Sequence, residues 1–486
     1  MKKGLPELLG RIEYQEVHGE KDKAVSGISH DSRAIEEGDL FLAIPGGNVD
    51  GHDFIAEAVD NGAEAIVGEK KREELCVGPV TYIRVRNSRK QMARISSSFY
   101  DDPTDSLFTI GITGTNGKTT TTHLTEEVLG KEETDAISTI TNEAVPGQEG
   151  PVTTPESPRI QEIARDILKS GKTNFVLEVS SHSLELDRVA GINFDVGLFT
   201  NLTRDHLDYH SSIGEYKNAK KKLFHCLNNG DTAILNDDED FSEEIEKVAN
   251  SETVKYGLTG SADVSAGYIK RTKKGISFKV HSPWGSAKIE SGLFGVYNVY
   301  NALGAITVGL TRGIELSEIA VRLERLNSLP GRMEKYELNN GADIYVDFAH
   351  NPGALERTLA ELSHLYESVS VVFGCGGESD HGKRPEMGKV AEQYGSMVYL
   401  TDDNPKEEDR MKILREIEKG MSKNSSHSVV PNRKEAIEQA IDDLEPESSL
   451  LIAGKGHESY QIVEGEWINY DDREYVEKLC REKSLI

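Results

Sequence analysis

The run Gly114-Thr115-Asn116-Gly117-Lys118-Thr119 carries the residue types that bind the phosphates of a nucleotide. Glycines let backbone N–H groups approach phosphate oxygens closely, and a helix that begins there directs its first N–H groups at the anion. Lys118 can reach the β- and γ-phosphates, and the hydroxyl of Thr119 can bind Mg²⁺. The common loop pattern has a glycine where this chain has Ile112. We prefer a phosphate loop to a plain strand–helix turn, because Gly-Lys-Thr stands between an apolar run and a helical segment.

Two further polar segments follow apolar runs and could serve the same chemistry. Glu178 lies near the end of NFVLEV, where a carboxylate beside a phosphate loop can hold Mg²⁺ or a water bound to it. The segment 203–208 adds two carboxylates and His206, and Lys220 follows a helical stretch. Taken singly, a surface glutamate and a structural loop histidine are the more common interpretations.

Three polar loops follow strand-like runs in the last third of the chain: GCGGESDHGKRP, TDDNPK and AGKGHE. Lys383 and Arg384 could bind a carboxylate or phosphate, and Asp403 and Glu458 could bind an amine. Ordinary turn chemistry is the alternative for these loops. We do not assign Cys375 as a nucleophile, because the sequence offers it no evident histidine partner.

Strands and helices must position these polar segments. The apolar pattern predicts an α/β fold in three domains: 1–104, 105–330 and 331–486. The central domain is predicted to contain strand, phosphate loop and helix, an antiparallel hairpin over 270–290, and a helical stretch near 297–325. In the last domain, four apolar runs at 342–350, 369–377, 397–405 and 449–457 predict a parallel sheet. Ligands of such sheets bind at the carboxyl ends of the strands, where the polar loops stand.

Composition excludes several classes of function. The formal net charge of −27 disfavours a nucleic-acid partner or an anionic membrane surface. The four cysteines are far apart, which argues against a disulfide framework or a zinc site. We see neither a signal peptide nor an apolar run long enough to cross a membrane, so we expect a cytoplasmic protein.

Taken in order, the motifs resemble those of the Mur ligases over essentially the whole chain. The resemblance is greatest to the members that add the third residue of the peptidoglycan stem peptide to UDP-N-acetylmuramoyl-L-alanyl-D-glutamate. The segments that carry it are HDSR, GTNGKTTTT, TTPES, EVSSHSL, TNLTRDHLDYH, YKNAK, GVYNVYNALGA, PGRME, DFAHNP, FGCGGESDHGKRP, DNPK and AGKGHESYQI.

The resemblance implies a UDP-sugar domain, a central ATP domain and a Rossmann-like domain for the incoming amino acid. It implies an acyl-phosphate mechanism, with Lys118, Lys220, His206 and Arg332 as catalytic residues. It places ATP at Gly114, Thr115, Asn116, Gly117, Lys118, Thr119, Thr120, Asn301, Arg332 and Asp347. It implies Mg²⁺ ligands at Thr119, Glu178 and His206, and at Lys220 in carbamylated form.

The same resemblance implies the substrate contacts. The UDP-sugar dipeptide is expected at His30, Ser32, Asn48, Thr153, Thr154, Ser180 and Arg188. The amino acid is expected at Arg384, Asp403, Asn404, Pro405, Lys406, Gly454 and Glu458. Diaminopimelate-adding members typically have DNPR and lysine-adding ones DNPA, whereas this chain has DNPK. A cation at Lys406 suits the distal carboxylate of diaminopimelate and repels the ammonium of L-lysine, so we expect diaminopimelate. Ser138 and Leu186 also depart from the family pattern.

Three alternatives remain open from the sequence. The chain could add L-lysine in the same reaction, or it could be a pseudomurein-type ligase of the same superfamily. HDSR and TTPES argue against a folylpolyglutamate-synthase-like enzyme. A nucleotide-binding switch protein is the alternative from another class, although the chain has no guanine-reading Asn-Lys-x-Asp. We expect a monomer.

Overall fold

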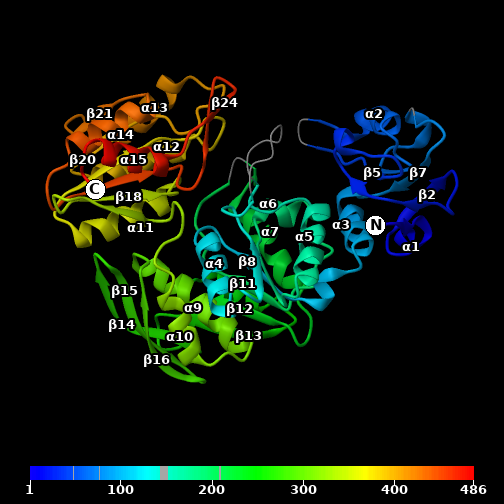
Figure 1. Cartoon of the computed structure of the whole chain (residues 1–486), viewed down its shortest axis with the longest axis horizontal. Helices are drawn as coiled ribbons and strands as arrows, with labels where there is room; N and C mark the ends of the chain where they lie inside the picture. Colours follow the sequence, from blue (N-terminus) through cyan, green and yellow to red (C-terminus); the bar gives the residue numbers. More distant parts are fainter. Residues whose placement is uncertain (47–48, 76, 143–151, 207–208) are drawn as a thin grey trace.

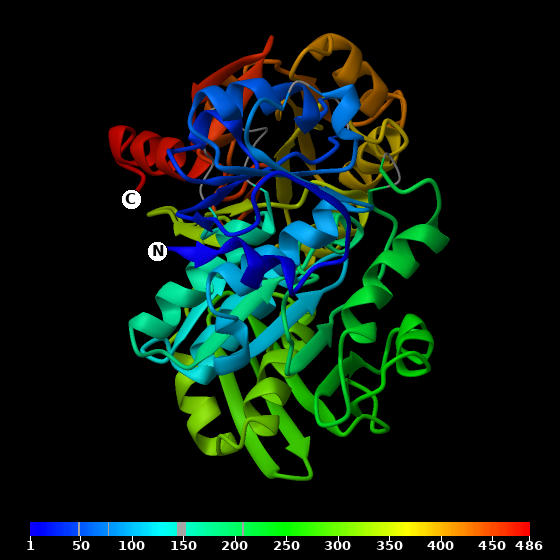
Figure 2. The ribbon, with the colours of Figure 1, turned by 90° about the vertical axis from the view of Figure 1, so that its right-hand side faces the viewer.

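The computed structural model describes residues 1–46, 49–75, 77–142, 152–206 and 209–486. They form an α/β protein with three large sheets, one in each successive part of the chain. The N-terminal and C-terminal parts lie on opposite sides of the central part (Figure 1). Seen from the side, the blue N-terminal part lies in front of the C-terminal part, and the green central part extends below both (Figure 2). The expected α/β class is confirmed.

The N-terminal sheet has the strand order β2-β7-β6-β5-β4, in which β2 is antiparallel and the others are parallel. Its strands are β2 (Tyr14–His18), β4 (Ile28–Ser29), β5 (Leu40–Leu42), β6 (Ala65–Gly68) and β7 (Thr81–Val85); β1 (Lys3–Gly4) pairs with β3 (Ala24–Val25) beside it. The helices are α1 (Leu5–Leu9), α2 (Ile55–Asp60) and α3 (Ser88–Phe99), with 3₁₀ turns at Ser32–Ala34, Gly51–Phe54, Arg72–Glu74 and Pro103–Ser106.

The central sheet has nine strands in the order β16-β15-β14-β13-β12-β11-β8-β10-β9. They are β8 (Phe108–Thr113), β9 (Thr134–Ile137), β10 (Asn174–Glu178), β11 (Val196–Phe199), β12 (Thr232–Asn236), β13 (Glu252–Gly257), β14 (Val264–Thr272), β15 (Gly275–Ser282) and β16 (Gly285–Ser291). Neighbours from β9 to β14 are parallel, and β14, β15 and β16 are antiparallel. The predicted hairpin is therefore part of a three-stranded antiparallel extension, whose first strand begins before the segment predicted.

Helices cover this sheet: α4 (Lys118–Leu129), α5 (Ser157–Lys169), α6 (Ser181–Glu185), α7 (Ile213–His225), α8 (Phe241–Glu246), α9 (Val296–Thr311) and α10 (Leu316–Glu324). Helix α9 is buried along most of its length, and it approaches α4 so closely that a Cβ on Gly309 would lie 2.4 Å from Val128 Cγ1. The predicted helical stretch near 297–325 is thus two helices. The first ends at Thr311, two residues before Gly313, whose φ of +89° favours glycine.

The C-terminal sheet has the order β17-β18-β22-β19-β20-β21, in which β17 is antiparallel and the others are parallel. Its strands are β17 (Glu334–Glu337), β18 (Asp343–Asp347), β19 (Val369–Phe373), β20 (Met397–Leu400), β21 (His427–Val429) and β22 (Ser449–Ala453). The other elements are α11 (Pro352–Leu365), α12 (Lys383–Tyr394), α13 (Arg410–Glu418), α14 (Arg433–Asp442), α15 (Asp472–Glu482) and the hairpin β23 (Tyr460–Val463)–β24 (Glu466–Asn469).

The four strands predicted in the C-terminal part are β18, β19, β20 and β22, and they are neighbours in the parallel portion of the sheet. Their carboxyl ends therefore meet at one edge, and the three polar loops lie there. Among the described residues, no helix combines the length and the apolar character needed to cross a membrane.

Candidate active site between the central and C-terminal parts

The phosphate loop joins β8, an interior strand of the parallel array, to α4. Gly114 and Gly117 have φ of +154° and +84°. A Cβ on Gly114 would lie 1.8 Å from Thr200 Oγ1, and one on Gly117 would lie 2.3 Å from Asn301 Oδ1. Both positions therefore require glycine. Ile112 is fully buried within β8, so the strand continues through the position where the common pattern has a glycine.

Residues at the end of β11 hold the loop in shape. Thr115 N–H donates to Asn201 O at 2.8 Å, and Asn116 N–H donates to Asn201 Oδ1 at 3.0 Å. Thr200 Oγ1 donates to Asn116 O at 2.8 Å. The loop is thus preorganised by hydrogen bonds to its own protein.

Two lysines contact the loop, of which Lys118 is partly buried and Lys220 is fully buried. Lys118 Nζ donates to Thr115 O at 2.9 Å, and Lys220 Nζ donates to Gly114 O at 2.7 Å. Burial lowers the pKa of Lys118, and it lowers the pKa of Lys220 well below its ordinary value. Lys220 also lies over the ring of Tyr216, 4.3 Å from the centroid.

The proposed oxygen ligands for a cation lie directly beside the loop. Thr119 Oγ1 donates to Glu178 Oε2 at 3.0 Å, and Thr139 donates to the same oxygen through N–H at 3.0 Å and Oγ1 at 3.1 Å. Arg332 Nη2 donates to Thr119 Oγ1 at 3.1 Å. Arg332 comes from the boundary of the C-terminal part and lies over the ring of Phe348 at 4.4 Å, so it brings a cation from one part to the phosphate loop of the other.

His206 lies on the loop that follows β11, with φ of +53°. Its ring packs against His182 at 4.9 Å, and its Nε2 lies 4.0 Å from Asp205 Oδ2. Burial lowers the pKa of His206 to about 4, although Asp205 acts in the opposite direction. The imidazole is therefore neutral near pH 7, the form that can bind a metal.

A cavity of about 630 Å³ opens above the phosphate loop. Its walls come from the loop, the N-terminal end of α9 and one face of α11, and so from both the central and the C-terminal parts. The predicted ATP residues on its wall are Thr115, Asn116, Gly117, Lys118, Thr119, Thr120, Asn301, Arg332 and Asp347. The structure thus brings these nine together around a single cavity.

Asn301 and Asp347 are also held by hydrogen bonds within the protein, as Lys118, Thr119 and Arg332 are. Asn301 Oδ1 accepts from Thr121 Oγ1 at 3.3 Å, and its Nδ2 donates to Asn298 Oδ1 at 2.8 Å. Asp347 accepts from Met333 N–H at 2.8 Å and from Ala349 N–H at 2.9 Å, and burial raises its pKa. Asn301 lies against Gly117, which places it beside the phosphate loop.

A second cavity, of about 260 Å³, lies on the other side of the loop. Gly114, Lys220 and Tyr216 line it, together with Ser180 in the segment after β10 and the start of α6. Lys118, Thr153 and His206 line both cavities. The two cavities therefore meet at a shared wall that carries a lysine, a threonine and a histidine.

The residues predicted to bind the UDP-sugar dipeptide are divided between two regions. Thr153, Ser180 and Arg188 line the second cavity. Thr154 Oγ1 donates to Glu178 O at 2.8 Å, and Arg188 Nη1 donates to Thr154 O at 2.9 Å. His30 and Ser32 lie in the N-terminal part and are not among the described residues that line either cavity; Asn48 lies outside the described residues.

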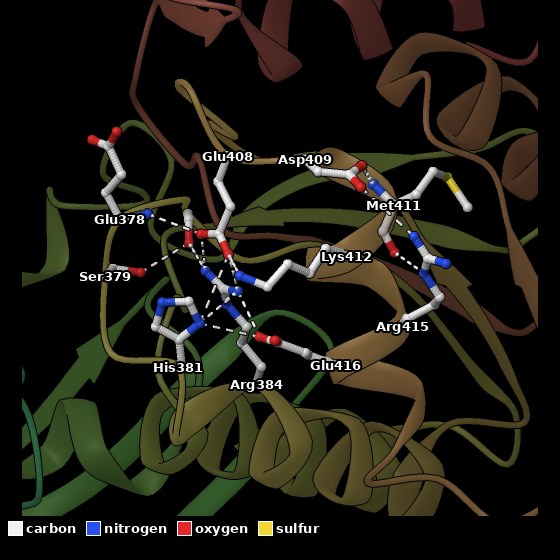
Figure 3. Close-up of polar contacts among 11 residues, drawn as sticks. Glu378, Ser379, His381, Arg384, Glu408, Asp409, Met411, Lys412, Arg415 and Glu416 are labelled. Carbon is white, nitrogen blue, oxygen red and sulfur yellow. Dashed lines mark hydrogen bonds and ion pairs between the residues drawn. The ribbon is translucent and has the colours of Figure 1, made fainter.

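Arg384, predicted to contact the amino acid, is fully enclosed by protein. Its Nη2 lies 2.7 Å from Glu408 Oε2, and its Nη1 lies 2.7 Å from Glu416 Oε2. Nη2 also donates to Gly376 O at 3.1 Å. Figure 3 shows the guanidinium between these two carboxylates, with His381 at its side. Arg384 thus ties the loop after β19 to α13.

The other predicted amino-acid residues converge where β20 and β22 end. Asn404 Nδ2 donates to Glu458 Oε2 at 3.1 Å, and a Cβ on Gly454 would lie 2.9 Å from Asp403 Oδ2. Pro405 O lies against the loop after β19, only 2.0 Å from where a Cβ on Gly377 would stand. Glu458 also lines the larger cavity, which connects this group to the phosphate loop.

Lys406 lies at the outer side of this group. It has φ of +54°, and its Nζ lies 3.8 Å from Glu378 Oε2. Both side chains are about half exposed, so the ammonium is accessible to a substrate.

Several residues of the site were missed by the sequence reasoning. Lys455 is fully buried, with its Nζ 3.0 Å from both Asn404 Oδ1 and Glu458 Oε2, and it balances the carboxylates there. The sequence could have indicated Lys455, because it lies within the AGKGHE loop that was already singled out. Arg271, Arg357 and Glu361 also line the larger cavity. They stand in segments that offered no motif.

Three family descriptions match the chain in order. They are "Mur ligase family, catalytic domain" over residues 24–100, "Mur ligase middle domain" over 112–309, and "Mur ligase, glutamate ligase domain" over 331–456. A protein of Clostridium tetani named UDP-N-acetylmuramoyl-L-alanyl-D-glutamate--2,6-diaminopimelate ligase is 38% identical over 488 residues, covering 98% of this chain and 99% of its own.

Solved structures match over similar lengths. One titled as a UDP-N-acetylmuramoyl-L-alanyl-D-glutamate--2,6-diaminopimelate ligase has a TM-score of 0.69 at 29% identity and covers all of both chains. The MurF ligase of Thermotoga maritima, solved in complex with ADP, has a TM-score of 0.63 at 22% identity, covers 88% of this chain and 94% of its own, and supports the fold alone.

Proposed function

The chain belongs to the Mur ligase family, and we propose that it adds meso-2,6-diaminopimelate to UDP-N-acetylmuramoyl-L-alanyl-D-glutamate in peptidoglycan synthesis. Enzymes of this family are ATP-dependent amide ligases. One observation carries the proposal: the cavity above the phosphate loop and the cavity lined by Ser180 and Arg188 meet at Lys118, Thr153 and His206. A phosphoryl donor in the first cavity and a carboxylate in the second would meet at that wall.

The reaction that suits this arrangement has two steps. The substrate carboxylate attacks the γ-phosphorus of ATP, which gives an acyl phosphate and ADP. The amine of the amino acid then attacks the acyl carbon, and inorganic phosphate leaves. Lys118 and Arg332 supply fixed positive charge near the phosphates, and the preorganised N–H groups of the loop hold them in place.

The residues beside the loop fit Mg²⁺. Thr119 and Glu178 offer hard oxygen ligands that already lie 3.0 Å apart, and His206 offers a neutral imidazole. When bound, the ion would neutralise charge on the transferring phosphoryl group. The chain's own part is to hold Glu178 in place through Thr139 and to hold Thr119 through Arg332.

We propose further that Lys220 is carbamylated. Lys220 is 1% exposed, and its Nζ donates to Gly114 O beside the cavity that His206 also lines. A buried amine that is largely neutral can attack CO₂ at carbon, and the N–H proton is released as the carbamate forms. The product carries a negative charge where the lysine would carry a positive one.

We propose that the third amino acid is selected at the loops after β19, β20 and β22. Arg384, Asp403, Asn404, Pro405, Gly454 and Glu458 shape these loops, and Lys406 offers its ammonium to the distal carboxylate of diaminopimelate. Because an ammonium in that place repels the side chain of L-lysine, diaminopimelate is the better substrate.

We further propose the domain bounds 1–104, 105–330 and 331–486, since each large sheet falls within one of these ranges. His30, Ser32 and Asn48 would hold the UDP-sugar from the first domain. The enzyme is proposed to act as a monomer in the cytoplasm, where ATP is available.

The test is turnover with an amino-acid panel. ADP release is measured with and without the UDP-sugar dipeptide, and with diaminopimelate, L-lysine or L-ornithine. We expect ADP release to require both the dipeptide and diaminopimelate, and to fall roughly tenfold or more with L-lysine. The variant Lys406→Ala should lose most of that preference, and Lys389→Ala, on the exposed side of α12, should retain it. Release that does not depend on the dipeptide would contradict the ligase proposal, and equal use of L-lysine would contradict the assigned amino acid.

A further inference from the structure

Helix α11 forms one wall of the larger cavity along much of its length. Its N-cap is Asn351, whose Nδ2 donates to Asn116 Oδ1 of the phosphate loop at 3.3 Å. Ala354, Arg357, Thr358 and Glu361 follow the spacing i, i+3, i+4, i+7, so they lie on one helix face, and all of them line the cavity. Glu361 lies about 15 Å beyond Asn351 along the helix axis. It is therefore at the end of the cavity away from the phosphates.

The carboxylate of Glu361 is only half satisfied by the protein. The residue is 4% exposed, and its Oε2 accepts from Arg271 Nη1 at 3.2 Å. Within the described part of the chain, Oε1 is buried and has no hydrogen-bond partner. A buried carboxylate oxygen without a hydrogen-bond donor is unfavourable. A donor from a bound ligand would satisfy Oε1.

The cavity that Glu361 lines also offers surface to a flat ring. Ala354 and Ala360 of α11 and Tyr297 at the start of α9 line it, together with the charged side chains of Arg271 and Arg357. Asn301, the residue expected to read the base, is held beside Gly117 by Thr121 and Asn298. Glu361 would therefore add a contact with the base at the far end of the cavity, beyond the one expected from Asn301.

We propose that Glu361 Oε1 accepts a hydrogen bond from the exocyclic amine of adenine and so selects ATP. Arg271 is a positioning residue: its bond to Oε2 turns Oε1 toward the cavity. The inference rests on the proposed function, because it requires ATP to occupy this cavity with its phosphates at the loop. A base with a carbonyl in place of the amine presents an acceptor to the carboxylate and is repelled.

The experiment measures nucleotide binding directly and so does not depend on ligase turnover. Dissociation constants for ADP and for purine riboside diphosphate, which lacks the amine, are obtained by calorimetry on the full-length protein. The ratio of the two constants reports the contact with the amine. The variants are Glu361→Gln, Glu361→Met and Arg271→Gln, and the matched control is Glu356→Gln on the exposed side of the same helix.

For the unmodified protein we expect ADP to bind roughly tenfold more tightly than the analogue, since bonds to charged groups are strong. The ratio should fall to about one in Glu361→Met and to an intermediate value in Glu361→Gln and Arg271→Gln. Glu356→Gln should keep the full ratio. Glu361→Met with an unchanged ratio, or unmodified protein that binds both nucleotides equally, overturns the inference. If the unmodified protein binds neither nucleotide, the proposed function itself fails.

Discussion

At the scale of single residues, the site depends on amines and guanidinium groups that the protein has buried. Lys220 is fully enclosed, and the cause of its lowered pKa is burial first and the neighbouring Lys118 second. Such a lysine contributes little as a cation. Because Lys220 lines the second cavity, the proposed carbamylation of its Nζ explains its position better than a role as a cation does.

We expect Lys220→Ala to lower ligase turnover by roughly a hundredfold, because it removes the group proposed to become a carbamate ligand. A short carboxylate added to the buffer should restore part of the activity by occupying the same space. The matched control is Lys221→Ala, since Lys221 pairs with Glu244 at 2.7 Å and lines neither cavity in the described chain.

The modification itself can be observed with isotopically labelled bicarbonate. A carbamate carbon signal should appear by NMR in the unmodified protein and be absent in Lys220→Ala. Unchanged turnover in the variant, together with no such signal in the parent, would rule out carbamylation.

Arg384 yields a prediction about pH. Its guanidinium lowers the pKa of Glu408; at Glu416 burial acts to raise the pKa, but bonds from His381 and Arg384 outweigh it and lower it. Carboxyls with lowered pKa values stabilise the fold above their ordinary pKa of 4.5, and that contribution is lost as the pH falls through the lowered values. Arg384→Met should therefore reduce the free energy of unfolding more at about pH 7 than at about pH 3.

Urea unfolding at the two pH values measures this difference. Lys412→Met is the control, because Lys412 makes a half-exposed pair with Glu408 that is worth at most about 1 kcal/mol. An equal loss in Arg384→Met at both pH values would mean that packing, and not charge, dominates.

The residue types of the site could be predicted from the sequence, but the state of their side chains could not. Motifs identified Arg384 and Asn301, yet both are bonded within the protein, because their partners Glu408, Glu416 and Asn298 come from other segments. Glu361 shows the opposite case. Its sequence context is an ordinary helical pattern. What distinguishes it is its burial and the lack of a hydrogen-bond donor to Oε1 among the described residues.

At the scale of elements, the phosphate loop depends on where β8 ends and α4 begins. Gly117 at that junction has φ of +84°, and Gly171 after α5 has nearly the same value, +82°. An added Cβ meets Asn301 Oδ1 at 2.3 Å in the first case and nothing within 4 Å in the second. These two glycines separate the effect of backbone conformation from the effect of contact.

We expect Gly117→Ala and Gly171→Ala each to lose about 1–2 kcal/mol of stability from the left-handed conformation, with a further loss in Gly117→Ala from displacement of Asn301. Gly117→Ala alone should weaken ADP binding, by roughly tenfold or more. Thermal unfolding and calorimetry provide the two measurements. Wild-type nucleotide affinity in Gly117→Ala would show that the loop tolerates a side chain there.

Elements with a strong local pattern could be predicted from the sequence. The apolar runs that became β18, β19, β20 and β22 are examples. Two features were missed: the break between α9 and α10 after Thr311, and the start of β14 at Val264, a strand whose buried residues are confined to its first three positions. The order of strands in the sheet depends on contacts distant in sequence, which no local pattern encodes.

At the scale of the whole molecule, Asn351 joins the C-terminal part to the phosphate loop. Its Oδ1 accepts from Ala354 N–H at 2.9 Å and caps α11, while its Nδ2 donates to Asn116 Oδ1 at 3.3 Å and Asp205 Oδ2 at 3.1 Å. Arg204 adds a second link, 3.3 Å from Glu386 Oε1. The active cavity exists only while these two parts are held together.

We expect Asn351→Ser to retain the helix cap and so to leave the free energy of unfolding nearly unchanged, while turnover falls roughly tenfold because the side chain no longer reaches Asn116 or Asp205. Asn351→Ala should lose turnover and also about 1 kcal/mol of stability. Urea unfolding and steady-state kinetics distinguish the two losses. Full activity in Asn351→Ser would show that the cap is the sole role of this residue.

The wall at which the two cavities meet has a thermodynamic consequence. Because Lys118, Thr153 and His206 belong to both cavities, we expect the proposed nucleotide and carboxylate substrate to influence each other's binding. If binding of one ligand orders those side chains, the second ligand binds to side chains that are already ordered, and its binding free energy changes accordingly. The coupling is reciprocal, so the factor by which ATP changes the affinity for the UDP-sugar dipeptide must equal the factor by which the dipeptide changes the affinity for ATP.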